Sequence, residues 1–231
     1  MKYSILLPYY KRPELHVALA SFVQHYTGRE DYEVIIIEDS KNVEDAGDHQ
    51  MLLDIIEQFK DRVNIQHYAD EMVSYSPCHK YNLGFTKAKG EFIVLSSPEI
   101  VHESDILRGF DELLAADRNC YIVCACKAIE EGEFHMWYQH SINRNMLFHF
   151  CSVMSRETFE KIGGFDERYC AGIGFDDEDL VRRLIANGIK IMPRNDLITI
   201  HLQHNRDYID NHRELVEVNR TLFLTGVSNG I

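Results

Sequence analysis

Hydrophobic and polar positions follow two patterns along the first hundred residues, one typical of strands and one typical of helices. Four short runs predict strands: residues 3–7, 31–37 and 91–95 are mostly apolar and predict buried strands, and residues 63–67 predict a further strand. Between these runs, apolar residues recur at helical spacing, as in Leu15, Leu19, Phe22 and Tyr26, and a further helix is expected to begin near Pro77. The alternation predicts an α/β fold with a Rossmann-like, mostly parallel sheet flanked by helices.

The remaining residues are less regular. A capped helix is expected from Ser104, and a terminal helix over 208–224. Apolar runs predict strands at 121–126 and 147–154, and two strand-like runs, 189–192 and 197–200, are separated by Pro193. Residues 130–145 are polar and aromatic, and they predict an irregular loop.

Composition narrows the possible partners. The formal net charge of -13 argues against nucleic acid or an anionic membrane as the main partner, and an anionic substrate needs a local metal ion or a few Arg residues. Six cysteines without C-x-x-C spacing are typical of buried thiols in a reducing cytosol. With no leader-like or membrane-spanning apolar run, we expect a cytoplasmic protein without an integral membrane segment. The oligomeric state stays open.

The most informative stretch combines glycines and acids. Gly163 and Gly164 precede an aromatic and acidic run, and Gly174-Phe175-Asp176-Asp177 opens an amphipathic helix. Carboxylates in the first turn of a helix face free backbone N–H groups, so they stay ionised, as a general base must be. On helix chemistry alone, Asp176 is also a plain capping residue, but the glycines favour a site where the backbone approaches a ligand.

Polar residues follow two of the predicted strands. Glu38-Asp39-Ser40 ends the second apolar run, and Ser97-Pro98-Glu99 comes after the fourth. Because open α/β sheets bind ligands at the carboxyl ends of their strands, both segments are candidate site residues.

Four motifs in order resemble a family 2 glycosyltransferase with the GT-A fold. They are the strand end Pro8-Tyr9-Tyr10-Lys11-Arg12, then Glu38-Asp39-Ser40, Asn82-Leu83-Gly84, and Ala88-Lys89-Gly90-Glu91-Phe92-Ile93. The later run Gly163-Gly164-Phe165-Asp166-Glu167, followed by Asp176-Asp177-Glu178-Asp179-Leu180, is similar to the acidic acceptor-side motif of inverting, galactosyltransferase-like enzymes, with Asp for Glu at its first acid. The resemblance spans roughly residues 3 to 204.

The resemblance implies a single domain over 1–231. Its nucleotide-binding half covers about 1–100, its acceptor-binding half about 101–205 with a small antiparallel element, and a helical segment about 206–231. It further implies that Asp177 is the catalytic base and that Asp176 contacts the acceptor. The residues implied to bind the nucleotide or donor are Pro8, Tyr9, Tyr10, Arg12, Glu38, Asp39, Asn82 and Ser97.

The metal motif is the largest departure from the family. Where the family has Asp-x-Asp, this chain has Ser97-Pro98-Glu99, so the resemblance leaves Glu99 and His201 to hold Mn²⁺ or Mg²⁺. His204 and Arg206 are candidates for diphosphate contacts. Trp137, Gly174 and Phe175 are candidates for acceptor binding, although Trp137 is equally suited to anchoring its loop to the core.

The expected function is transfer of a sugar, with inversion, from a nucleotide-diphosphate donor to a hydroxyl of a glycan or similar acceptor. A UDP-sugar is the favoured donor. Two alternatives remain: a degenerate nucleotide-sugar-binding module and a metal-independent transferase. A nucleotidyltransferase needs a glycine-rich phosphate loop near the N-terminus, and Tyr9-Tyr10-Lys11-Arg12 contains no glycine.

Overall fold

The computed structural model describes the chain except for residues 73, 131, 140–148, 205–211 and 227–231. Its strands are β1 (Tyr3–Tyr9), β2 (Tyr32–Glu38), β3 (Ile65–Ala69), β4 (Phe92–Ser96), β5 (Ile100–His102), β6 (Cys120–Glu130), β7 (Glu133–Tyr138), β8 (Cys151–Ser155) and β9 (Lys190–His201). Its helices are α1 (Leu15–His25), α2 (Ser40–Glu44), α3 (Ala46–Phe59), α4 (Cys78–Lys87), α5 (Ile106–Ala116), α6 (Arg156–Lys161), the 3₁₀ helix η1 (Glu167–Ala171), α7 (Asp176–Ala186) and α9 (Arg213–Thr225).

Among the described residues the strands form one nine-stranded sheet in the order β3-β2-β1-β4-β8-β6-β9-β5, with β7 paired to β6. The first four strands pair in parallel, as the alternation of strands and helices predicts. Strand β8 then runs antiparallel to β4, so its amino end lies beside the carboxyl end of β4. This reversal brings residues from the second half of the chain to the ligand-binding edge of the first.

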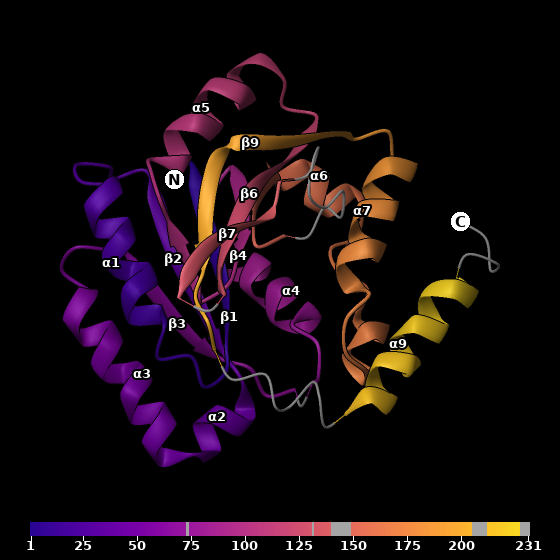
Figure 1. Ribbon diagram of the computed structural model, residues 1–231, viewed down its shortest axis with the longest axis horizontal. Coiled ribbons are helices and arrows are strands. Elements are labelled where there is room, and N and C mark those ends of the chain that lie inside the picture. Colours follow the sequence, from indigo (N-terminus) through magenta and orange to yellow (C-terminus); the bar gives the residue numbers. More distant parts are fainter. Residues whose placement is uncertain (73, 131, 140–148, 205–211, 227–231) are drawn as a thin grey trace.

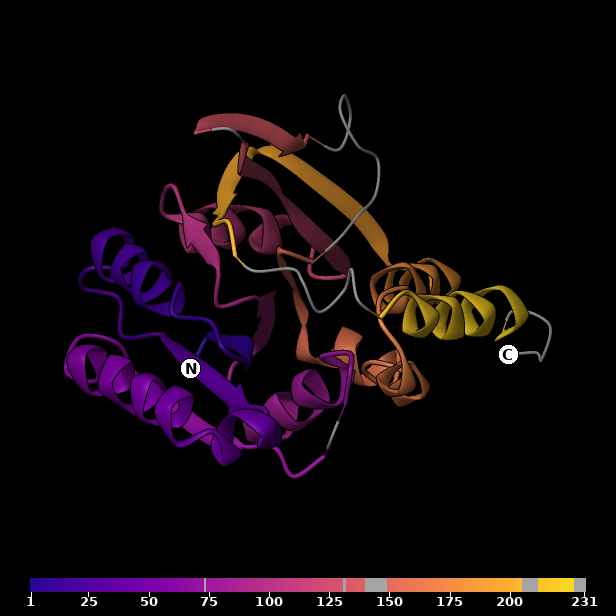
Figure 2. The same cartoon turned by 60° about the horizontal axis from the view of Figure 1, so that its bottom comes forward.

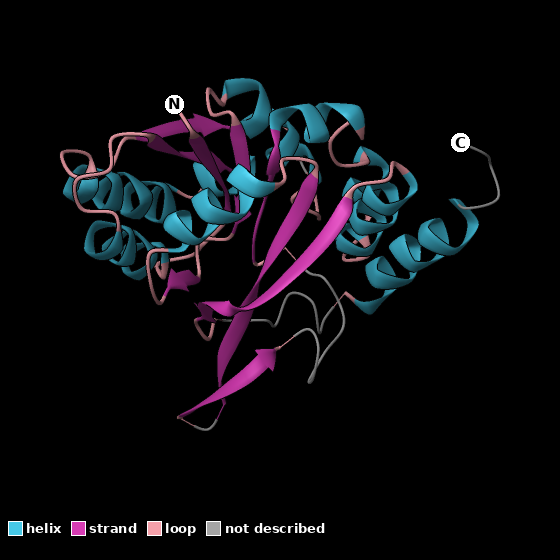
Figure 3. Ribbon diagram, turned by 90° about the horizontal axis from the view of Figure 1, so that it is seen from above, coloured by secondary structure: helices cyan, strands magenta, loops and turns pink. Residues whose placement is uncertain are grey.

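Helices cover both faces of the sheet (Figures 1 and 3). One core packs α1, α3 and α5 on the sheet, with side chains such as Leu19 and Phe110 fully buried. The other core packs α4, α6 and α7, with Tyr81 and Leu180 against the opposite face. The predicted α/β class with a mostly parallel, helix-flanked sheet is confirmed.

Three local predictions need correction. The segment predicted as a loop contains β7, which pairs with β6 as a hairpin and lies at the outer edge of the sheet in Figure 2. The two runs around Pro193 form a single strand, β9, because Pro193 pairs with β6 on one side while β5 pairs with β9 only from Thr199 onward. The cap of α5 is Asp105, whose side chain accepts from the Arg108 N–H, and not Ser104.

Helix α9 lies against η1 and the start of α7 (Figures 1 and 2). Its buried Asn219 donates to the carbonyls of Tyr169 and Gly174, both at 2.9 Å. A side chain at Gly172 would meet Asn219 and the Leu215 carbonyl, each 2.5 Å from the added carbon, so only glycine permits this close packing. The α9 helix therefore fixes the loop that leads into α7. No described helix combines the length and hydrophobicity that crossing a membrane requires.

Candidate active site

A cavity of about 420 Å³ opens at the carboxyl ends of β1, β2 and β4. Of the sequence-predicted residues, those that line it are Pro8, Tyr9, Tyr10, Arg12, Asp39, Ser97, Glu99, Gly174, Asp176, Asp177, His201 and His204. Other described lining residues, which the sequence reasoning missed, include Lys41, Ser74, Tyr75, Ser76, Lys80, Tyr81, His149 and Phe150. The fold thus brings Asp39, Glu99, His201 and Asp177 to one crevice.

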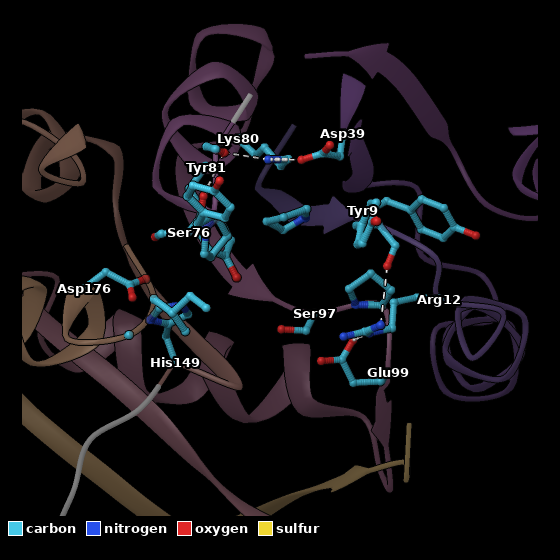
Figure 4. Close-up of a pocket in the computed structure, with 18 of the residues that line it drawn as sticks. Tyr9, Arg12, Asp39, Ser76, Lys80, Tyr81, Ser97, Glu99, His149 and Asp176 are labelled. Atoms are coloured by element: carbon cyan, nitrogen blue, oxygen red, sulfur yellow. Dashed lines mark hydrogen bonds and ion pairs between the residues drawn. The ribbon is translucent and has the colours of Figure 1, made fainter. Parts of the chain in front are cut away.

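At one end of the cavity, Asp39 and Lys80 form a buried pair (Figure 4). The Asp39 Oδ2 atom lies 2.6 Å from Lys80 Nζ, and each residue is 4% exposed. Asp39 also caps α2, since its Oδ1 accepts from the Lys41 N–H at 2.9 Å. Lys80 Nζ donates to Ser74 Oγ at 2.8 Å. A carboxylate acceptor and an ammonium donor side by side match a base edge with adjacent N–H and C=O groups.

Glu99 meets two imidazoles at another wall. His201 Nε2 and His204 Nε2 each lie 3.8 Å from Glu99 Oε1. Strand pairing explains this meeting, because Ile100 of β5 is in register with His201 of β9, and the Leu202 N–H donates to the Glu99 carbonyl at 3.0 Å. Arg12 Nε lies 3.6 Å from Glu99 Oε2.

The three side chains fit a divalent cation. One donor atom from each of Glu99, His201 and His204 lies within 4.8 Å of the others. A carboxylate oxygen with two imidazole nitrogens is a donor set that Mn²⁺ accepts. Ser97, at the first place of the family's acidic pair, lines the cavity but brings no charge.

His149 and Asp176 lie across the cavity from Arg12 and Glu99 (Figure 4). His149 Nδ1 is 2.5 Å from Asp177 Oδ1, an ion pair of adjacent groups outside hydrogen-bond angles. Burial and the charge of Asp177 raise the pKa of Asp176 to about 7. Burial opposes the charged form of His149, but the charges of Asp177, Asp176 and Glu178 outweigh it and raise the pKa of His149.

The start of α7 differs from the predicted cap. Phe175, not Asp176, occupies the N-cap position, with a left-handed φ of 63°, and Asp176 is the first helical residue. Phe175 does not line the cavity: its ring packs on Phe223 of α9, 5.7 Å between centroids. The left-handed turn directs the chain from the clamped Gly174 loop into the helix that carries both acids. Further along α7, the apolar side chain of Ile185 is 58% exposed.

Asn82 lies outside the cavity and holds the glycine turn. Its Oδ1 accepts from the Phe165 N–H at 2.8 Å, and its Nδ2 donates to the Phe165 carbonyl at 2.9 Å. Gly164 has a φ of 68°, and a side-chain carbon there would lie 2.5 Å from Asn82 Oδ1. From the other side, Arg183 pairs with the buried Asp179 and donates to the Gly164 carbonyl at 2.6 Å. These residues join α4, the turn and α7 into one unit.

Two more predicted residues lie behind the cavity wall. Glu38 is fully buried, accepts from Asn42 and contacts the imidazoles of His49 and His67. Trp137 packs against Phe150 and against His201, with centroids 5.2 and 5.3 Å away, contacts of an anchoring residue. Arg206 lies outside the described residues.

The missed residues differ in how visible they are in the sequence. Lys80, Tyr81 and Gly84 share the buried face of α4, so a lysine at a sheet-facing helical position is a signal that periodicity reveals. His149 carries no such signal. It reaches the cavity because Cys151 of β8 pairs with Ser96 at the end of β4, and the direction of that pairing cannot be read from either strand alone.

The fold and the cavity indicate the class of protein: the chain has the GT-A fold and resembles the glycosyltransferases that share it. Residues 141–205, which contain the Asp176-Asp177 run, match a family described as the N-terminal domain of galactosyltransferase. Chondroitin synthase from Escherichia coli is 27% identical over 131 residues, covering 56% of this chain and 18% of that protein. These matches confirm the predicted glycosyltransferase resemblance.

Solved structures share the same architecture. S. aureus TarS 1-349 in complex with UDP-GlcNAc has a TM-score of 0.74 at 14% identity, with 96% of this chain and 65% of that chain covered. The mannosyltransferase PcManGT from Pyrobaculum calidifontis, in complex with GDP-Man and Mn²⁺, has a TM-score of 0.74 at 14% identity, with 100% and 65% covered. At this identity the likeness concerns the fold. The chain thus spans only part of the length of these proteins.

Proposed function

We propose that this protein transfers a sugar, with inversion, from a nucleotide-diphosphate donor to a hydroxyl group of a glycan acceptor. The observation that carries the proposal is the single cavity lined by Asp39, Glu99, His201 and Asp177, which come from distant parts of the chain. Nucleotide, metal and base positions are the three elements that such a reaction requires. Each is represented at a separate wall of this cavity.

The nucleotide end contains Asp39 and Lys80. The carboxylate accepts from a base N–H, and the ammonium group donates to the neighbouring carbonyl. Uracil presents this pair of groups, and so do thymine and guanine, whereas cytosine and adenine lack the adjacent N–H and C=O. A UDP-sugar is the donor we favour; among the similar structures, one holds UDP-GlcNAc and the other GDP-Man.

The diphosphate end contains Glu99, His201 and His204, which would hold Mn²⁺ or Mg²⁺. When bound, the cation neutralises charge on the departing diphosphate. Arg12 adds a fixed positive charge beside Glu99. It orients phosphate oxygens through its guanidinium N–H groups.

The transfer step uses the wall of the cavity that contains Asp176, Asp177 and His149, which we call the acidic wall. The acceptor oxygen attacks the anomeric carbon and forms the new C–O bond, the bond from that carbon to the diphosphate oxygen breaks, and the hydroxyl proton passes to Asp177. Asp176 contacts the acceptor. Base assistance of this kind contributes roughly 10²–10⁴ in rate. A base on one wall and a leaving-group site on the opposite wall suit direct displacement, which inverts the anomeric centre.

The test is a donor panel. The protein is incubated with UDP-, GDP- and dTDP-sugars and a mixture of glycan acceptors, with Mn²⁺ or with a chelator, and released nucleotide diphosphate is measured. We expect release from one donor class in the presence of Mn²⁺. Donor binding without release under every condition would instead support a degenerate binding module, and undiminished release with the chelator would support a metal-independent transferase.

A further inference from the structure

Packing contacts hold the side chain of His149 in the acidic wall. It is 7% exposed and lines the cavity. Its ring edge packs against Tyr81, 5.2 Å between centroids, and against Phe165, 5.3 Å. These two rings stack on each other at 4.8 Å, and the Tyr81 hydroxyl donates to the Ser96 carbonyl at 2.8 Å. The imidazole is therefore held in one place by rings that are themselves fixed.

We propose that His149 is a positioning residue for Asp177: its imidazolium holds one carboxylate oxygen of the base and leaves the other oxygen for the acceptor proton. This inference rests on the proposed function. It is carried by the 2.5 Å contact between His149 Nδ1 and Asp177 Oδ1 and by the ring packing that fixes the imidazole. No sequence motif points to His149.

The imidazolium of His149 also acts electrostatically on the acids around it. The first turn of α7 contains four carboxyl groups, those of Asp176, Asp177 and Glu178 and that of Asp179, which pairs with two arginines of the same helix. Burial together with the charge of Asp177 raises the pKa of Asp176, and burial raises the pKa of Glu178. A cation beside Asp177 offsets this mutual repulsion.

Three buried titratable groups near this cluster stay neutral. Tyr81 and Cys78 on α4 and Tyr121 on β6 are buried, and burial raises the pKa of each well above its usual value. The described groups therefore leave His149 as the cation that contacts Asp177. Proton transfer then proceeds from the acceptor hydroxyl to Asp177, while His149 keeps its own proton throughout.

Two variants separate charge from packing. His149→Phe preserves a ring against Tyr81 and Phe165 and removes the cation, whereas His149→Asn keeps a polar group without charge. His49→Asn is the matched control, because it removes an imidazole that pairs with a carboxylate, Glu38, at 3.0 Å but does not line the cavity. Nucleotide diphosphate release is measured between pH 5 and 9, with the UDP-, GDP- or dTDP-sugar that proves active in the donor panel.

We expect both His149 variants to lower kcat at neutral pH by about 10²-fold, with the donor KM changed less than about threefold. The acid limb of the kcat profile should move to higher pH, since the carboxyl groups at the start of α7 lose their neighbouring cation. The control variant His49→Asn should leave the acid limb of the kcat profile at its wild-type pH. A uniform loss of kcat with an unmoved limb, a kcat within threefold of wild type, or a changed KM alone would each overturn the assignment.

A readout that does not need turnover completes the test. In NMR titrations of histidine-labelled protein, the His149 signal, identified by its loss in His149→Asn, should titrate above the usual histidine range and fall in Asp177→Asn. A His149 signal that titrates at the same pH in Asp177→Asn as in wild type refutes the pair even in an active enzyme. This measurement also tests the pair if His149→Phe does not fold. If the pair is present but no nucleotide sugar is consumed, the proposed function fails and the role given to His149 fails with it. Loss of Mn²⁺ binding in His149→Asn would identify a metal ligand instead and overturn the proposal.

Discussion

Removing the Asn82 side chain tests whether this residue stabilises the glycine turn or binds the donor. The resemblance implies a position near the donor, but the structure places the amide between α4 and the turn. There it accepts from the Phe165 N–H at 2.8 Å and donates to the Phe165 carbonyl at 2.9 Å. Its contact with Glu167 is exposed and adds little.

The expected cost of Asn82→Ala follows from the two backbone groups that it leaves without partners. Phe165 is 2% exposed, and each buried polar group without a partner costs about 1–3 kcal/mol. Both hydrogen bonds are only partly buried, so we expect a loss of about 2–4 kcal/mol in the free energy of unfolding. For a domain of this size, 1 kcal/mol corresponds to about 2–4 °C in Tm, so Tm should fall by about 4–16 °C.

Thermal and urea unfolding measure this loss, and isothermal titration with the active nucleotide sugar measures donor affinity below the variant's Tm. Asn64→Ala is the control, because Asn64 is an exposed residue whose side chain accepts a hydrogen bond from Gln66, and its removal should change stability by less than about 0.5 kcal/mol. We expect donor affinity in Asn82→Ala to stay within about threefold of wild type. A Tm equal to that of wild type, together with a tenfold loss of donor affinity, would refute the structural role.

Three further predictions concern the acidic and metal walls. Asp177→Asn should retain donor affinity in titration calorimetry and lose about 10²–10⁴ in transfer rate, and wild-type-like transfer would exclude it as the base. Glu99→Ala should weaken Mn²⁺-dependent donor binding at least about tenfold while leaving binding in chelator unchanged; equal losses in both conditions would contradict a metal role. Because burial and Asp177 raise the pKa of Asp176 to about 7, Asp176 holds its proton more fully in the folded than in the unfolded protein between about pH 4 and 7, so its contribution to wild-type stability should fall over that window. Asp176→Asn should therefore gain stability relative to wild type as pH rises, by at most about 4 kcal/mol. Urea unfolding from pH 4.5 to 8 measures this, and a constant difference in unfolding free energy between variant and wild type would contradict it.

The first half of the chain was predictable because its signals are local. Apolar runs that end in polar residues mark buried parallel strands, and the carboxyl ends of such strands meet at one edge whatever the lengths of the helices between them. Asp39 and Glu99 could thus be assigned to one cavity without any knowledge of pairing. The acidic start of α7 could be predicted for a similar reason, since the glycines and acids that mark this helix start lie close together in the sequence.

The second half depends on pairing that no local pattern records. Strand β8 reverses direction beside β4, and this reversal alone brings His149 to the cavity. Strand β9 continues through Pro193 because its neighbour β5 is short, a fact about the partner and not about β9 itself. Asn82 matched a donor motif by its sequence context, yet its two bonds to Phe165 form only once α4 and the glycine turn have packed together.

The charges of the cavity bear on whether a metal ion is needed. Three of its cationic side chains each face a carboxylate: Lys80 at Asp39, Arg12 at Glu99 and His149 at Asp177. A paired cation attracts a further anion more weakly than a free cation does, because the field of its partner opposes the incoming charge. The chain as a whole carries -13, so its long-range field also repels a diphosphate. A divalent ion between Glu99 and the two imidazoles supplies the missing positive charge, and for this reason we favour metal-dependent over metal-independent transfer.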